Sequence, residues 1–153
     1  MQKTAANISL RFSVPDRRDV LVDTGPLVAL FNKNDNYHER CVRSLKTLRS
    51  PLLTVWPVIT ETIYLLSFSG PAQDALWEWF KRGGLNIAEL SGVDIPRIQE
   101  LMEKYRDLPM DLSDAALVRV AERDKLRSLF TLDLHDFRLY RPSHVRSLSL
   151  ILV

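Results

Sequence analysis

Residues 19–31 have the sequence DVLVDTGPLVALF, and this stretch decides the fold. Its apolar residues 20–22 predict a short buried strand. Pro26 lies just inside the helix expected to follow, where the missing N–H of proline costs nothing. Asp23 stands between the two elements. Open parallel sheets hold their ligand chemistry at such strand-to-helix junctions, so we expect Asp23 to lie in a functional site.

The composition indicates one ordinary domain. The chain has 153 residues, enough for a real hydrophobic core and too few for two comfortable domains. A formal net charge of +2 is weak grounds for nucleic-acid binding, so the position of the 21 Lys and Arg residues matters more than their number. Cys41 is the single cysteine, which excludes an intramolecular disulfide. This fits a reducing cytoplasm, and no apolar run is long enough to span a membrane, so we expect a cytoplasmic protein without a membrane partner.

Short apolar runs alternate with segments of helical periodicity. The expected strands are 20–22, 51–55, 85–90, 128–132 and 147–153. The expected helices are one containing Pro26, then 35–48, 58–68, 72–82, 93–105 and 114–123, the last capped by Ser113, with an Arg- and aromatic-rich loop at 135–144. This alternation predicts an α/β fold with a mainly parallel sheet. Residues 1–18 are expected to form a flexible or misassigned N-terminal extension, outside a domain that spans 19–153.

Acidic residues recur where strands end and helices begin. Five positions follow this pattern: Asp23, Glu61, Asp111, Asp114 and Asp133. If the strands are parallel neighbours, all five lie at the same edge of the sheet. Carboxylates crowded there would repel one another by roughly several kcal/mol, so some must take up protons or a cation must lie among them.

The acids indicate a particular cation and a particular chemistry. Hard oxygen ligands without a cluster of His or Cys select Mg²⁺ or Mn²⁺ over Zn²⁺. Phosphodiester hydrolysis uses such a site, because one ion or two can lower the pKa of a water and stabilise the leaving oxygen. Thr24 and Thr131 each lie beside an acid, and we expect their hydroxyls to orient the ligands or a water.

Each acid taken singly also has a structural interpretation. Helix caps, first helical turns and Asx turns all use these residue types, and this applies to Asp136 beside Asp133 as well. Spacing alone leaves both interpretations open, and the joint pattern favours the metal site.

Four segments together resemble the PIN-domain ribonucleases, most closely the VapC-like toxins of bacterial and archaeal toxin–antitoxin pairs. The segments are VLVDTGPLVALF (20–31), LTVWPVITETIYLL (53–66), LPMDLSDAALVRVAER (108–123) and LFTLDLHDF (129–137). They occur in the order and spacing of the family and span most of residues 19–140. Relatives usually begin close to the first strand, so the leader at 1–18 departs from the pattern.

The resemblance implies a PIN-like three-layer α/β/α domain and a Mg²⁺- or Mn²⁺-dependent endoribonuclease. By motif, the family's four acids correspond to Asp23, Glu61, Asp114 and Asp133. Asp111 would be a supplementary acid, and Asp136 would be an alternative to Asp133. The resemblance also implies an RNA substrate, a homodimer, and a cognate antitoxin that inserts a peptide into the acidic groove.

Contact with RNA must come from residues other than the acids. Arg138, Tyr140 and Arg141 interleave positive charge with an aromatic ring close to the expected site. This combination suits phosphate contact and base stacking, so we predict that these residues bind RNA.

Two other functions compete with the nuclease. One is a catalytically silent PIN module that serves as an RNA- or protein-binding scaffold. The other is an aspartate-nucleophile phosphatase, which also has an Asp after its first strand. Such enzymes typically need a second Asp two residues later, and this chain has Gly25 there.

Overall fold

The computed structural model describes residues 18–108 and 110–151. Its strands are β1 (Val20–Val22), β2 (Leu52–Thr54), β3 (Leu85–Ile87), β4 (Ser128–Phe130) and β5 (Ser149–Ile151). Its helices are α1 (Thr24–Phe31), α2 (His38–Thr47), α3 (Trp56–Leu65), α4 (Gly70–Lys81), α5 (Ile95–Lys104), α6 (Leu112–Asp124) and α7 (Leu134–Leu139), with a short 3₁₀ helix η1 (Gly92–Asp94) before α5.

The five strands form one parallel sheet in the order β3-β2-β1-β4-β5. Strand β1 lies at the centre, where Val20 pairs with Leu52 of β2 on one side and with Ser128 of β4 on the other. The chain builds outward from β1 to β3, and then crosses to the other side of β1 to add β4 and β5. The strand order therefore reverses between β1 and β4, and ligands of open parallel sheets bind at such a switch point.

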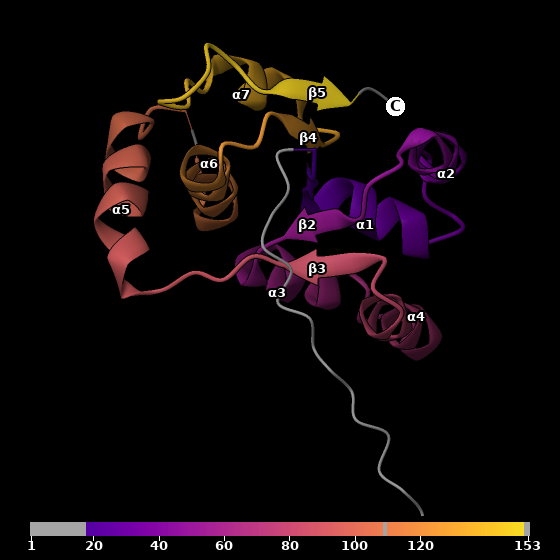
Figure 1. Cartoon of the computed structure of the whole chain (residues 1–153). Coiled ribbons are helices and arrows are strands. Elements are labelled where there is room, and N and C mark those ends of the chain that lie inside the picture. Colours follow the sequence, from indigo (N-terminus) through magenta and orange to yellow (C-terminus); the bar gives the residue numbers. More distant parts are fainter. Residues whose placement is uncertain (1–17, 109, 152–153) are drawn as a thin grey trace, which may run out of the picture.

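Helices lie on both sides of the sheet, as an all-parallel sheet requires. Figure 1 shows α5 and α6 together on one side of the strands, with α1, α2 and α4 on the other. This arrangement confirms the predicted three-layer α/β/α fold with a parallel sheet.

Helix α6 is buried along most of its length. The four residues from Ala115 to Val118 are completely enclosed, so this helix has no broad solvent-facing side there. Two acids of the same helix, Asp114 and Glu122, are carried into the interior with it. Burial of a carboxylate is costly unless it is hydrogen-bonded or paired, so the partners of these acids matter for both stability and chemistry.

The structure corrects two local predictions. The sequence predicts Ser113 as the cap of α6, but Asp111 is the N-cap, and its carboxylate accepts a hydrogen bond from the backbone N–H of Asp114 at 2.9 Å. The sequence predicts a loop at 135–144, but α7 occupies its first half. Asp133 caps this helix by accepting from the N–H of Asp136 at 3.2 Å. Aspartate is a strong N-cap, so both helices begin where an Asp can satisfy the free donors.

The predicted extension at 1–18 falls outside the described residues except for Arg18, so it stays a prediction. Within the described part of the chain, none of the helices combines the length and the apolar character needed to cross a membrane.

Candidate active site

Asp23 lies at the switch point, directly after β1. Its Oδ1 accepts from the backbone N–H of Thr24 at 2.7 Å, and its Oδ2 accepts from the hydroxyl of Thr131 at 2.9 Å. Burial raises the pKa of Asp23 to about 6. The two hydrogen bonds lower the pKa, and the negative charges of Glu61 and Asp111 raise it further.

Glu61 approaches the same site from α3. The hydroxyl of Thr24, at the start of α1, donates to Oε2 of Glu61 at 2.8 Å. Thr24 therefore contacts two acids, Asp23 through its backbone N–H and Glu61 through its side chain. The hydroxyls of Thr24 and Thr131 thus each contact an acid, and their role in orienting the carboxylates stays a prediction.

Asp114 is buried in the first turn of α6. Burial raises its pKa to about 7, and the charges of Asp111, Asp23 and Asp133 add to this effect in that order. These acids belong to three different strand-to-helix or loop-to-helix junctions. The structure therefore brings them close enough to interact electrostatically, as the sequence predicts for acids at one edge of a parallel sheet.

The carboxylate of Asp114 contacts Tyr140, a residue for which the sequence predicts a different role. Tyr140 is completely buried, and its hydroxyl donates to Oδ2 of Asp114 at 2.9 Å. Burial, together with the charge of Asp114, raises the pKa of the Tyr140 phenol, so it remains a proton donor. The prediction that Tyr140 stacks on RNA bases is wrong, because an enclosed ring presents no face to a ligand.

Helix α7 brings two further acids to the edge of this site. Asp133 is exposed, and its backbone N–H donates to the hydroxyl of Thr131 at 3.0 Å. Asp136 lies one turn later, 3.5 Å from Nδ1 of His135. Asp133 contributes to the raised pKa of Asp114, so its charge is felt at the centre of the site.

The two predicted RNA-binding arginines remain at the surface. Arg138 and Arg141 are both exposed. The guanidinium of Arg141 donates to the backbone carbonyls of Arg138 and Tyr140, at 2.5 and 2.9 Å, so it lies folded against the end of α7. Both side chains are available to a ligand that approaches α7.

The donor set suits a hard divalent cation. Among residues 18–108 and 110–151, no group of three or more His, Cys, Asp or Glu side chains is gathered closely enough to form a ready metal shell. Mg²⁺ does not need one, because it keeps several waters and is held through one or two carboxylates. Burial is the main cause of the raised pKa values of Asp23 and Asp114, and the negative charges of neighbouring acids raise them further, a repulsion that a bound cation would relieve.

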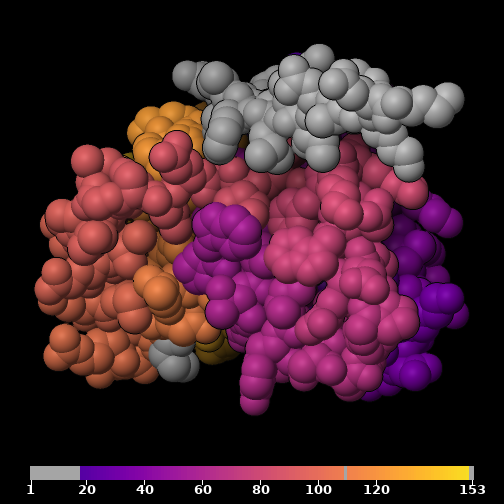
Figure 2. Space-filling model, turned by 90° about the horizontal axis from the view of Figure 1, so that it is seen from below, coloured from indigo at the N-terminus to yellow at the C-terminus, as the bar shows by residue number. Residues whose placement is uncertain are grey.

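A surface groove leads away from Glu61. It has a volume of about 620 Å³ and is lined by Trp56, Pro57, Thr60, Glu61, Tyr64, Asp111, Leu112 and Ser113. Figure 2 shows the face on which α3 lies between α5 and α4. The exposed rings of Trp56 and Tyr64 were not singled out by the sequence analysis, although their spacing of eight residues on one helix is a detectable signal.

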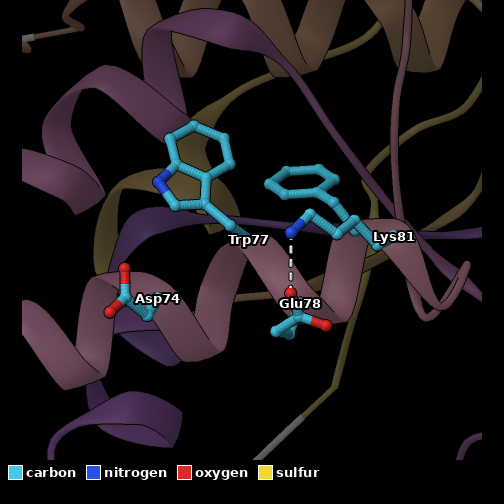
Figure 3. Close-up of a pocket in the computed structure, with 5 residues that line it drawn as sticks. Asp74, Trp77, Glu78 and Lys81 are labelled. Carbon is cyan, nitrogen blue, oxygen red and sulfur yellow. Dashed lines mark hydrogen bonds and ion pairs between the residues drawn. The ribbon is translucent and has the colours of Figure 1, made fainter.

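A second hollow lies on α4. It is lined by Asp74, Trp77, Glu78, Phe80 and Lys81, and Nζ of Lys81 donates to Glu78 at 2.7 Å (Figure 3). It contains none of the acids predicted for catalysis, so it is not a candidate active site.

The chain is similar to known proteins both in sequence and in structure. The family model described as "PIN domain" matches residues 20–141. Ribonuclease VapC26 of Mycobacterium tuberculosis is 26% identical over 125 residues, which are 80% of this chain and 93% of that protein.

Two solved structures share the fold. The crystal structure of VapC20 of Mycobacterium tuberculosis, described as a sarcin-ricin loop cleaving toxin, matches with a TM-score of 0.71 and 18% identity, covering 83% of this chain and 98% of the other. The structure of VapBC2 from Rickettsia felis bound to a promoter DNA fragment matches with a TM-score of 0.60 and 18% identity, covering 86% and 98%.

Proposed function

This chain belongs to the PIN domain family, and on that premise we propose that it is an endoribonuclease that hydrolyses RNA phosphodiester bonds. The similarity to a protein named as a ribonuclease supports this proposal. The observation that carries it is the environment of Asp114, on which the charges of Asp111, Asp23 and Asp133 all act. A nuclease that depends on a divalent cation needs such a convergence of acids.

We assign the acids to a Mg²⁺ or Mn²⁺ site. The residues that would hold the cation or its waters are Asp23, Glu61, Asp114 and Asp133, with Asp111 as a supplementary acid and Asp136 as the alternative to Asp133. When bound, the cation supplies positive charge to the phosphate and lowers the pKa of a water.

The hydroxyl groups around the acids do the positioning. Thr131 fixes one oxygen of Asp23, and Thr24 fixes one oxygen of Glu61. Both threonines lie on well-packed junctions at the edge of the sheet, and both are buried. A carboxylate that is already oriented needs little reorganisation when substrate and cation arrive, and this is how such a network favours catalysis.

The acids also make the site sensitive to pH. With pKa values of about 6 for Asp23 and about 7 for Asp114, the cation competes with protons for both carboxylates. Cation affinity, and with it RNA cleavage, should therefore increase as the pH rises from 6 to 8.

We further propose that the protein is the toxin of a VapBC-type pair and acts in the cytoplasm. The likeness to a VapBC structure supports an antitoxin partner, and the buried single thiol of Cys41 fits a reducing compartment. We expect a homodimer. Arg138 and Arg141 are the proposed contacts to RNA phosphates, because both are exposed beside the acids of α7.

The test is cleavage of end-labelled structured RNAs by the purified full chain. We expect cleavage with Mg²⁺ or Mn²⁺, none with EDTA, and loss of at least about 100-fold for Asp23→Asn or Asp114→Asn with the fold retained. Asp74→Asn is the matched control, because Asp74 is an exposed acid on α4 outside the site. Asp23→Asn with wild-type activity would refute the assignment.

The rival to this proposal is a catalytically silent scaffold that binds RNA or protein. A protein that binds RNA in the presence of Mn²⁺ but cleaves no tested RNA would support the scaffold. Against it stands the electrostatic strain on Asp114, which a domain without catalysis has no need to retain.

A further inference from the structure

Tyr140 directly follows α7 and is completely buried, and its side chain contacts an acid of the site. Its phenol donates to Oδ2 of Asp114 at 2.9 Å. A hydrogen bond to a charged acceptor is stronger and more directional than one between neutral groups. The bond therefore restricts the Asp114 carboxylate to one orientation.

The ring of Tyr140 is itself held in place. It packs against Tyr105 with ring centroids 5.0 Å apart, and against Phe137 edge-to-face at 5.3 Å. The hydroxyl of Tyr105 accepts from the backbone N–H of Arg141 at 2.7 Å, which fixes the chain immediately after Tyr140. Because ring and backbone are both fixed, the position of the phenol oxygen is set by the fold.

The segment that follows is anchored independently. The backbone N–H of Ser143 donates to the carboxylate of Glu122 at 2.8 Å, and Nε2 of His144 lies 2.6 Å from the carbonyl of Leu126. Loss of the phenol oxygen should therefore leave α7 and the loop after it docked on α6. This makes a Tyr140→Phe variant a clean probe of the hydrogen bond.

The bond also makes the two carboxylate oxygens of Asp114 inequivalent. Within the described part of the chain, the only hydrogen bond to its carboxylate goes to Oδ2, so Oδ1 keeps its lone pairs. Helix α7 carries Asp133 and Asp136, and the same contact ties this helix to α6. Tyr140 thus sets the orientation of Asp114, while the independent anchors keep the acids of α7 in place beside it.

We propose that Tyr140 is a positioning residue, which commits Oδ2 of Asp114 to the phenol and leaves Oδ1 for the divalent cation. This inference rests on the proposed function. It replaces the predicted role of Tyr140 in base stacking with a role inside the acidic site.

The test compares Tyr140→Phe with Tyr105→Phe. Both changes remove one hydroxyl from a buried tyrosine of the same cluster, but only Tyr140 contacts an acid. Partners of metal ligands typically change metal affinity or activity by about 10- to 100-fold. We expect Tyr140→Phe to weaken Mn²⁺ binding, measured by electron paramagnetic resonance of the free ion, by about that factor, and to lower kcat with little change in KM for RNA.

Tyr105→Phe keeps the ring that packs against Tyr140 and loses only the acceptor for the N–H of Arg141, so it should change both measurements less than Tyr140→Phe does. Equal effects of the two variants would overturn the proposal, because the loss would then reflect packing alone. In an Asp114→Asn background, Tyr140→Phe should cause no further loss of Mn²⁺ affinity. An additive loss there would also overturn it, because Tyr140 would then act independently of Asp114.

A measurement on the wild-type protein guards against a variant that does not fold. Added Mn²⁺ should broaden the NMR signals of the Tyr140 ring more than those of Tyr105. Equal or weaker broadening at Tyr140 would overturn the proposal. Wild-type protein that binds Mn²⁺ but cleaves no RNA would refute the nuclease assignment, while the Mn²⁺ affinities of the two variants would still decide the role of Tyr140.

Discussion

The hydroxyl of Thr131 lies 2.9 Å from Oδ2 of Asp23 and donates a hydrogen bond to it, although 108 residues separate the two in the chain. The bond joins the ends of β4 and β1, the two strands between which the strand order reverses. The same hydroxyl accepts from the N–H of Asp133 at 3.0 Å. Thr131 therefore links the first and fourth predicted acids through one oxygen atom.

Thr131→Val should lower both stability and activity. Valine keeps the shape but leaves two buried or half-buried groups without their partner, at a cost of about 1–3 kcal/mol in the free energy of unfolding. Urea denaturation measures this cost. Because the lost bond lowers the pKa of Asp23, that pKa should rise further above 6 in the variant. RNA cleavage at pH 7 should fall as a result.

Thr54→Val is the control for this prediction. Thr54 is equally enclosed, and its hydroxyl donates to the carbonyl of Val22 at 2.9 Å without touching an acid. It should lose comparable stability but retain RNA cleavage close to the wild-type rate. Equal activity losses in the two variants would mean that Thr131 acts only through stability.

Stability should fall as the pH rises from 4 to 7. The folded-state pKa values of Asp23 and Asp114, about 6 and about 7, lie above the ordinary value of 3.8. Between pH 3.8 and about pH 7 the folded state binds more protons than the unfolded state, so the free energy of unfolding decreases as the pH rises. The contribution is full below pH 3.8 and is lost above about pH 7. It amounts to a few kcal/mol for each of the two groups, since one pKa unit corresponds to about 1.4 kcal/mol.

The variant Asp114→Asn tests the predicted direction of this pH dependence of stability. This variant should be more stable than the wild type at pH 8 without divalent cations, and its stability should depend less on pH between 5 and 7. Urea denaturation at several pH values measures both effects. Asp94 and Glu122 have lowered pKa values, so their contribution is lost only as the pH falls below the ordinary carboxylate range. A wild-type protein whose stability increases from pH 5 to 7 would contradict the prediction.

The cluster around Asp94 should be essential for folding and irrelevant to chemistry. Asp94 is almost fully buried, and Arg119 and Arg123 of α6 approach it at 2.8 and 3.2 Å. Breaking a buried pair leaves an uncompensated charge, so Asp94→Ala should cost about 3–5 kcal/mol in the free energy of unfolding. Asp124 also contacts Arg123 but is more exposed than Asp94. The substitution Asp124→Ala should therefore lower the free energy of unfolding far less. Similar losses in the two variants would argue against the role of burial.

Much of the fold could be predicted from the sequence, and particular residues show why. The apolar run Val20–Val22 followed by Asp23 and Pro26 determines a strand and a helix by local rules, and the structure has both. Parallel strands need crossover connections, which are usually helices, so a regular alternation of strands and helices predicts a parallel sheet. The acids at the junctions then reach one edge as a consequence of topology.

The wrong predictions concern residues whose secondary structure or burial is determined by tertiary contacts. Residues 135–144 are rich in polar and aromatic side chains, and no apolar stripe there indicates a helix, yet Asp133 caps α7 and Phe137 packs into the core. Tyr140 lies in the same segment, directly after α7, so its burial depends on how α7 docks on α6. No local pattern distinguishes a tyrosine that stacks on a ligand from one that donates to a buried carboxylate.

The last prediction concerns divalent cations and stability. At pH 8, where Asp23 and Asp114 are both ionised, Mg²⁺ or Mn²⁺ should relieve their repulsion and raise the melting temperature. A ligand at 100 times its Kd stabilises the folded state by about 2.7 kcal/mol, which for a chain of this size corresponds to a shift of roughly 5–10 °C. The shift should shrink as the pH falls from 7 to 5, because protons then occupy the same carboxylates. Asp23→Asn should abolish most of it, and Asp74→Asn should leave it unchanged. If Mg²⁺ raises the melting temperature of the wild type no more than NaCl of equal ionic strength, the acids do not form a cation site, and the scaffold function becomes the better account of the domain.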